Sequence, residues 1–138
     1  LPEGDNKVLA GGPMMGKSVV SLDVPVCKGT NSITVLSGAD AHRKKAQNCI
    51  RCAKCVSACP MGLEPYLLAT LSVNQDWERL EANDVTSCIS CGCCQFTCPA
   101  HRPLLDNISF GKGHVMGIIK GRAAKAKAAK AEADKAKA

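Results

Sequence analysis

Eight of the ten cysteines in this chain fall into two runs with the same spacing. Both runs follow the pattern C-x2-C-x2-C-x3-C-P, and their members are Cys49, Cys52, Cys55 and Cys59, and Cys88, Cys91, Cys94 and Cys98. Cysteine thiolates with this spacing hold iron–sulfur clusters in bacterial two-cluster proteins. Because such clusters carry single electrons, the two runs predict electron transfer.

A [4Fe–4S] cube needs one thiolate for each iron. In two-cluster proteins the last cysteine of each run ligates the other cluster. The predicted ligands of cluster 1 are therefore Cys49, Cys52, Cys55 and Cys98. The predicted ligands of cluster 2 are Cys88, Cys91, Cys94 and Cys59. This crossed assignment places the two clusters close together, as an electron relay requires.

Other uses of cysteine fit this pattern less well. Structural zinc sites usually pair C-x2-C with a distant second pair, and disulfide frameworks are typical of small secreted chains. A zinc-stapled interaction module is the remaining alternative for these residues. Cys27 and Cys93 lie outside the pattern. We expect Cys27 to be a small core residue and Cys93 to be a spare thiol beside a ligand.

Charge distinguishes the two runs. Arg51 and Lys54 lie inside the first run, whereas the second run has no charged residue between its cysteines. Positive neighbours favour the reduced, more negative cluster, so cluster 1 is predicted to have the higher potential. The alternative interpretation is that both cations point to water.

The net charge of +6 is concentrated at one end of the chain. Residues 120–138 hold seven lysines and arginines against two acids, so the rest is near neutral. Thiolate-bound clusters would make this body acidic, and we predict no nucleic-acid partner. Thiolate ligands imply a reducing compartment. No apolar stretch reaches the roughly 20 residues that span a bilayer, and the start at Leu1 suggests part of a longer protein.

Sequence patterning predicts an α+β chain. Residues 1–40 are expected to be β-rich, with short strands over 7–10, 19–22 and 33–36 between turn residues. Residues 41–120 are expected to form a mainly α-helical ferredoxin-like domain with two [4Fe–4S] clusters. One predicted helix begins at Pro65, a second spans residues 75–82, and a third begins near Pro103. Gly111, Gly113 and Gly117 should weaken the third helix. Residues 121–138 are predicted to form an Ala/Lys-rich, solvated and partly helical tail.

One further motif points to different chemistry. Residues 11–18, GGPMMGKS, match the phosphate-binding loop expression G-x-x-x-x-G-K-[ST]. A phosphate site of that class needs a helix directly after the loop. The next residues, VSLDVP at 20–25, are β-branched and stopped by proline, so no helix is expected there. We interpret the motif as a glycine-rich turn.

Several longer motifs resemble one known family. They are GGPMMG at 11–16, VPVCKGTN at 24–31, CIRC at 49–52, CPMGL at 59–63 and CISCGCC at 88–94. Over residues 7–119 the chain resembles the C subunits of Rnf (Rsx) electron-transport complexes. All eight cluster cysteines of the family carry over, one by one, to the positions assigned above.

The resemblance implies a peripheral subunit on the cytoplasmic side of a bacterial inner membrane. The complex is a multisubunit, ion-translocating oxidoreductase that exchanges electrons between NAD(H) and ferredoxin. Residues 1–40 would then be the end of a soluble-ligand-binding β-grasp region, and FMN would be bound only by a more N-terminal part. The glycine-rich turn at 11–16 is a feature of the family in its own right.

Two rival functions follow from the same residues. One is an iron–sulfur subunit of another respiratory or disulfide-reducing enzyme, which differs in its partner. The other is a nucleotide-binding ATPase with accessory clusters, in which Lys17 would contact phosphate. No residue pattern here predicts bond-making catalysis by side chains, so the fragment itself is expected to be an electron-transfer module.

Overall fold

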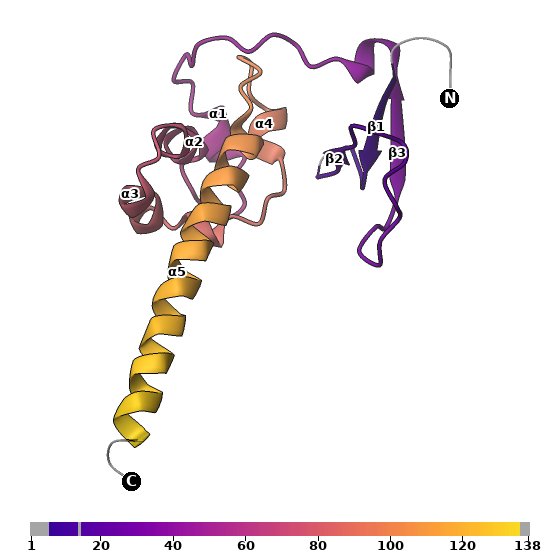
Figure 1. Cartoon of the computed structure of the whole chain (residues 1–138). Coiled ribbons are helices and arrows are strands. Elements are labelled where there is room, and N and C mark those ends of the chain that lie inside the picture. Colours follow the sequence, from indigo (N-terminus) through magenta and orange to yellow (C-terminus); the bar gives the residue numbers. More distant parts are fainter. Residues whose placement is uncertain (1–5, 14, 136–138) are drawn as a thin grey trace.

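The computed structural model describes residues 6–13 and 15–135. A small sheet comes first, a long connecting segment follows, and a helical body takes up residues 54–135 (Figure 1). The C-terminal helix runs through this body and projects well beyond it (Figure 1). The parts of the predicted β-rich region and tail at 1–5 and 136–138 lie outside the described residues.

The sheet has three antiparallel strands in the order β2-β1-β3. They are β1 (Asn6–Ala10), β2 (Lys17–Ser18) and β3 (Ile33–Ser37), followed by the 3-10 helix η1 (Gly38–Ala41). Val8 pairs with Val35, and Leu9 of β1 is buried. The first and third predicted strands are confirmed within one residue at each end. As predicted, no helix follows the glycine-rich turn.

The predicted strand over 19–22 is wrong, because pairing begins and ends earlier. The turn before it is tight: the Gly16 N–H donates to the Gly12 carbonyl at 2.8 Å. The chain therefore returns to β1 already at Lys17. After Val19, the Ser21 hydroxyl accepts a hydrogen bond from the Asp23 N–H at 3.2 Å, which turns the backbone away. Local side-chain hydrogen bonding thus overrides β propensity here.

Cys27 is exposed, so its expected role as a core residue is wrong. It lies in the connection between β2 and β3, where the Thr30 N–H donates to its carbonyl at 2.9 Å. The turn keeps this segment outside the sheet. Residues 42–50, which lead to the first cysteine run, are also exposed and have no regular secondary structure.

The helical body contains five α-helices and one 3-10 helix within the described residues. They are α1 (Lys54–Ser57), α2 (Pro65–Val73), α3 (Trp77–Ala82), η2 (Val85–Ser87), α4 (Cys93–Phe96) and α5 (Leu104–Lys135). Pro65 occupies the first turn of α2, as predicted, because its missing N–H has no partner there anyway. Asp76 caps α3 by accepting from the Arg79 N–H at 3.2 Å.

One apolar core joins α2, α3, η2 and α5. Its buried members are Leu68, Ala69, Leu71, Leu80, Val85, Leu104, Ile108 and Val115. Four of the cluster cysteines pack against this core from outside, namely Cys55, Cys88, Cys94 and Cys98. The core therefore supports the backs of both cysteine runs.

Helix α5 is continuous through Gly111, Gly113 and Gly117, so the weakening predicted at these glycines does not interrupt it. Gly111 sits where α5 packs against α2. A Cβ at this position would lie 1.8 Å from the Ser72 Oγ and 2.5 Å from the Leu80 Cδ2. The absence of a side chain is thus what allows the two helices to approach, and the packing outweighs the low helix propensity of glycine.

The second half of α5 leaves the body. Arg122 still ties it to α3 through an ion pair with Glu81, with Nη2 at 2.6 Å from Oε1. The side chains of residues 121–129 are exposed, as expected for a solvated tail. Across the described part of the chain, no helix combines the length and apolarity needed to cross a bilayer.

We expect Gly111→Ala to lower the free energy of unfolding by about 1–3 kcal/mol, because the added methyl overpacks the α2–α5 contact. The measurement is the thermal unfolding midpoint of the cluster-loaded chain without oxygen. Gly113→Ala is the matched control, since nothing lies within 4 Å of a Cβ there. It should raise stability by about 0.5–1 kcal/mol. Equal effects of the two substitutions would contradict this account.

Candidate iron–sulfur site

The two cysteine runs fold into loops with the same backbone course. Each loop has left-handed residues at three equivalent positions. They are Arg51 (φ 54°), Ala53 (φ 58°) and Gly62 (φ 65°) in the first loop, and Ser90 (φ 56°), Gly92 (φ 82°) and His101 (φ 50°) in the second. Four of these six are not glycine, and such conformations persist only where the surroundings enforce them. The repeated strain makes both loops candidates for a functional site.

Hydrogen bonds repeat with the same register. The Ala58 N–H donates to the Lys54 carbonyl at 3.0 Å, and the Thr97 N–H donates to the Cys93 carbonyl at 3.0 Å. These bonds close the single helical turns α1 and α4. Alternation of left- and right-handed residues turns successive N–H groups into one concavity, which favours anions and iron–sulfur clusters.

The first loop lines an open cavity of about 550 Å³. All four predicted ligands of cluster 1 lie on its wall: Cys49, Cys52, Cys55 and Cys98. Arg51, Tyr66 and Arg102 line it as well. Cys98 reaches the cavity from the second run, so the structure brings together the set that the crossed assignment names.

A second hollow lies at the other loop. Its lining includes the four predicted ligands of cluster 2, namely Cys59, Cys88, Cys91 and Cys94. The remaining walls are mostly apolar, with Met61, Leu63 and Ile108 among them. This hollow encloses only about 20 Å³. The donor set fits a cluster, and the hollow would have to widen to hold one.

All ten cysteines are free thiols in the described part of the chain. Among the same residues, no three His, Cys, Asp or Glu side chains converge closely enough to hold a single metal ion. The thiols line the walls of two hollows instead. Cys93 lines neither hollow, in keeping with its assignment as a spare thiol.

The thiols differ in acidity because their surroundings differ. The backbone N–H of Arg51 lowers the pKa of Cys49, and the hydrogen-bonding Arg102 side chain adds to this effect. Burial raises the pKa of Cys55, and it raises the pKa of Cys94 to about 11. Because only thiolates bind iron, cluster binding must displace the proton from Cys94 at neutral pH.

Three residues near the loops had no clear sequence signal. Lys112, part-buried on α5, donates to the Cys88 carbonyl with Nζ–O 2.6 Å. The Gln95 side chain accepts from the Leu105 N–H at 3.0 Å and so caps the start of α5. Arg102 approaches Cys49. In the sequence Lys112 lies among glycines and Gln95 lies between cysteines, which indicates no role for either residue. Their roles depend on the position of α5 beside the second loop.

The structure separates the two cations of the first run. Arg51 lines the first cavity, whereas Lys54 is exposed and does not line it. Arg102 adds a second cation to this cavity, and Lys112 places one beside the second loop. With Lys112 beside the second loop, we expect a smaller difference in reduction potential between the two clusters. The higher reduction potential of cluster 1 stays a prediction.

Comparison with known proteins agrees with this geometry. Residues 46–62 and 86–110 match a family described as the 4Fe-4S binding domain. These segments contain both cysteine runs and the start of α5. The chain thus contains a ferredoxin-type 4Fe–4S domain in a mixed structure of helices and one small sheet.

Longer matches extend over most of the chain. It is 41% identical over 110 residues to the C subunit of the Na(+)-translocating ferredoxin:NAD(+) oxidoreductase complex of Acetobacterium woodii, a match that covers 80% of this chain and 25% of that protein. It is 38% identical over 119 residues to the C subunit of the ion-translocating oxidoreductase complex of Rhodobacter capsulatus, covering 80% and 21%. The chain is homologous to the C subunits of ion-translocating oxidoreductase complexes.

A third homologous protein gives a shorter match around the cysteine runs. The C subunit of the proton-translocating ferredoxin:NAD(+) oxidoreductase complex of Clostridium ljungdahlii is 45% identical over 65 residues, covering 47% of this chain and 14% of that protein. The chain therefore spans a quarter or less of the length of these C subunits. Their names confirm the family inferred from the motifs.

We expect Gly92→Ala to destabilise the second loop by about 1–3 kcal/mol, because Gly92 is buried and left-handed. Ala53→Gly, the equivalent change in the first loop, should leave stability unchanged or raise it. The change removes the strain of a left-handed alanine from the folded state. This gain offsets the larger conformational entropy that glycine loses on folding. Thermal unfolding midpoint and iron content of both variants test this pair. A larger loss for Ala53→Gly would contradict it.

Lys112→Met should weaken the second loop, because the Cys88 carbonyl loses its charged donor. The expected loss of stability is about 1.5–3 kcal/mol, with a lower reduction potential for the cluster held there. Thermal unfolding and an EPR-monitored redox titration measure the two effects. Lys120→Met, an exposed change on the same helix, is the control. If both variants behave alike, Lys112 has no specific role at this loop.

Proposed function

We propose that this chain relays single electrons through two [4Fe–4S] clusters. One observation carries the proposal: each of the two predicted ligand sets lines one hollow, and each set takes its fourth cysteine from the other run. The crossing requires the two loops to be neighbours, which the packing of α1 against α4 supports. Bound clusters supply the one-electron chemistry.

The residues of the chain hold and tune the clusters. In this proposal Cys49, Cys52, Cys55 and Cys98 ligate cluster 1, and Cys88, Cys91, Cys94 and Cys59 ligate cluster 2. Backbone N–H groups of the loops stabilise the thiolates, as the N–H of Arg51 does for Cys49. The apolar walls of the second hollow limit the access of water, which lowers the local dielectric and influences the potential.

We further propose that the relay works inside a multisubunit, ion-translocating oxidoreductase. The names of the homologous C subunits support ferredoxin and NAD(H) as the redox partners of that complex. The proposed location is peripheral, on the cytoplasmic side of a bacterial inner membrane. The proposed division is an end of a soluble-ligand-binding β-grasp region over 1–40, the two-cluster domain over 41–120, and the tail over 121–138.

Anaerobic reconstitution tests the two-cluster proposal. We expect about eight irons and eight sulfides per chain, and a spin-coupled EPR signal after reduction with dithionite. Cys98→Ser should lower the iron content and disturb cluster 1, although Cys98 belongs to the second run. Cys93→Ser should keep the full iron content, because Cys93 lines neither hollow.

Specific results would refute the proposal. Tightly bound zinc in place of iron would indicate a structural module. About four irons without spin coupling would rule out the two-cluster relay. An intact cluster 1 signal in Cys98→Ser would rule out the crossed ligation while leaving an iron–sulfur role in place.

A further inference from the structure

We propose that the surface around the first cavity is a docking site for an acidic electron-transfer protein. The inference rests on the proposed function and adds the kind of partner and the point of contact. The surface consists of Ile50, Arg51 and Arg102, which line the cavity with the exposed Cys49 and Cys52, and of Lys44 and Lys45 on the exposed segment that leads to Cys49. We call it the basic face.

The first observation is exposure. Cys49 and Cys52 are the two exposed members of the eight, whereas the other six are partly buried. A cluster bound there would have one edge near solvent, and electron transfer between proteins needs close approach to such an edge. Ile50, between them, is 68% exposed and offers an apolar contact at the centre of the face.

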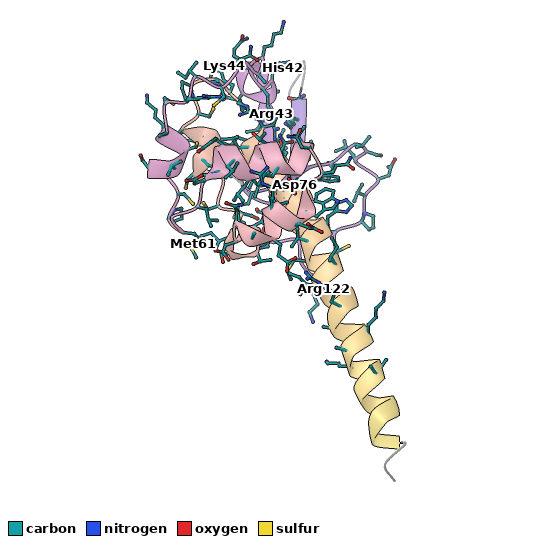
Figure 2. All side chains as sticks on the ribbon, turned by 90° about the vertical axis from the view of Figure 1, so that its left-hand side faces the viewer. His42, Arg43, Lys44, Met61, Asp76 and Arg122 are labelled. Atoms are coloured by element: carbon teal, nitrogen blue, oxygen red, sulfur yellow. The ribbon has the colours of Figure 1, made fainter. Side chains whose placement is uncertain are left out.

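The second observation is the charge of the surrounding chain. Residues 41–63 contain five lysines and arginines and no Asp or Glu, whereas Asp84 is the single charged residue over 84–100. Arg43 and Lys44 lie at one end of the helical body, and Met61 lies at the other end (Figure 2). Met61 lines the second hollow, so Arg43 and Lys44 lie at the end away from that hollow.

The third observation is that the cations of the basic face fall into two groups, one beside the cluster ligands and one free to meet a partner. Arg51 and Arg102 face Cys49, so their charge partly compensates a bound cluster. Lys44 and Lys45 line neither hollow and form no ion pair or hydrogen bond with the residues that the structure describes. They stand on an exposed segment beside Arg43, which pairs with Asp106. Unpaired charge on the segment that leads to an exposed redox edge suits electrostatic steering of an acidic partner.

The test uses the cluster-loaded chain, reduced without oxygen, as electron donor. Two protein probes of opposite charge serve as acceptors, an acidic flavodoxin and a basic cytochrome c. In each encounter the chain loses one electron and the probe gains it, and stopped-flow absorbance gives the second-order rate. With flavodoxin we expect the rate to fall at least tenfold, within the usual range of steering effects, between about 10 mM and 500 mM salt. The cytochrome c rate should not fall.

Charge reversal locates the effect. Lys44→Glu with Lys45→Glu should slow flavodoxin reduction about tenfold at low salt and leave the EPR spectrum and reduction potentials unchanged. Lys125→Glu with Lys127→Glu changes the net charge equally on the exposed part of α5. This matched control should stay within about twofold of the unaltered chain, because its charges are distant and screened.

Each alternative outcome has one meaning. A chain that binds no iron refutes the proposed function, and no docking question arises. If the chain binds full iron but its rate of flavodoxin reduction does not depend on salt, the docking proposal is wrong. If the control pair Lys125→Glu with Lys127→Glu slows flavodoxin reduction equally, docking does not occur at the basic face. If Lys44→Glu with Lys45→Glu instead releases the chain from anionic phosphatidylglycerol vesicles at unchanged rates, the face contacts a membrane and the docking proposal is wrong.

Discussion

Both cysteine runs must turn several backbone N–H groups toward one concave space, and the rest of the structure depends on this constraint. The turn requires left-handed residues, and the chain accepts them at Arg51, Ala53 and Ser90, where no glycine is available. Conformations of this kind cost free energy. The apolar core behind Cys55 and Cys94 offsets that cost by fixing both loops from one side.

The core in turn depends on how closely α5 can approach α2. Gly111 permits this approach, Gln95 fixes the start of α5, and Lys112 binds the second loop to it. These three residues connect a single helix to both the core and the second cysteine run. A chain with only the cysteine spacing would lack the scaffold that brings Cys98 to the first cavity.

Spacing and turn chemistry were sufficient to predict much of this arrangement. The x2 and x3 intervals identify the thiols, and Pro65 correctly predicts the start of α2. Helix propensity is a local property, so it did not indicate that Gly111 is needed for the tertiary contact with Ser72. The strand predicted after Lys17 failed because Ser21 and Asp23 form a local turn. The roles of Arg102 and Lys112 could not be predicted, because each contacts a cysteine residue that is far away in the sequence.

Helix α5 also sets a length scale. Its 32 residues correspond to roughly 48 Å of rigid rod. Lys125 and Lys127 lie 13 and 15 residues beyond Lys112, which contacts the second loop, so roughly 20 Å of helix separates them from that contact. This distance is about two Debye lengths, since that length is about 8–10 Å at moderate ionic strength. The formal charge of +6 consequently misrepresents the field at the redox centres. That field arises from nearby groups alone, and modification or removal of the lysine-rich end would change the isoelectric point of the protein while leaving its electron energetics as they were.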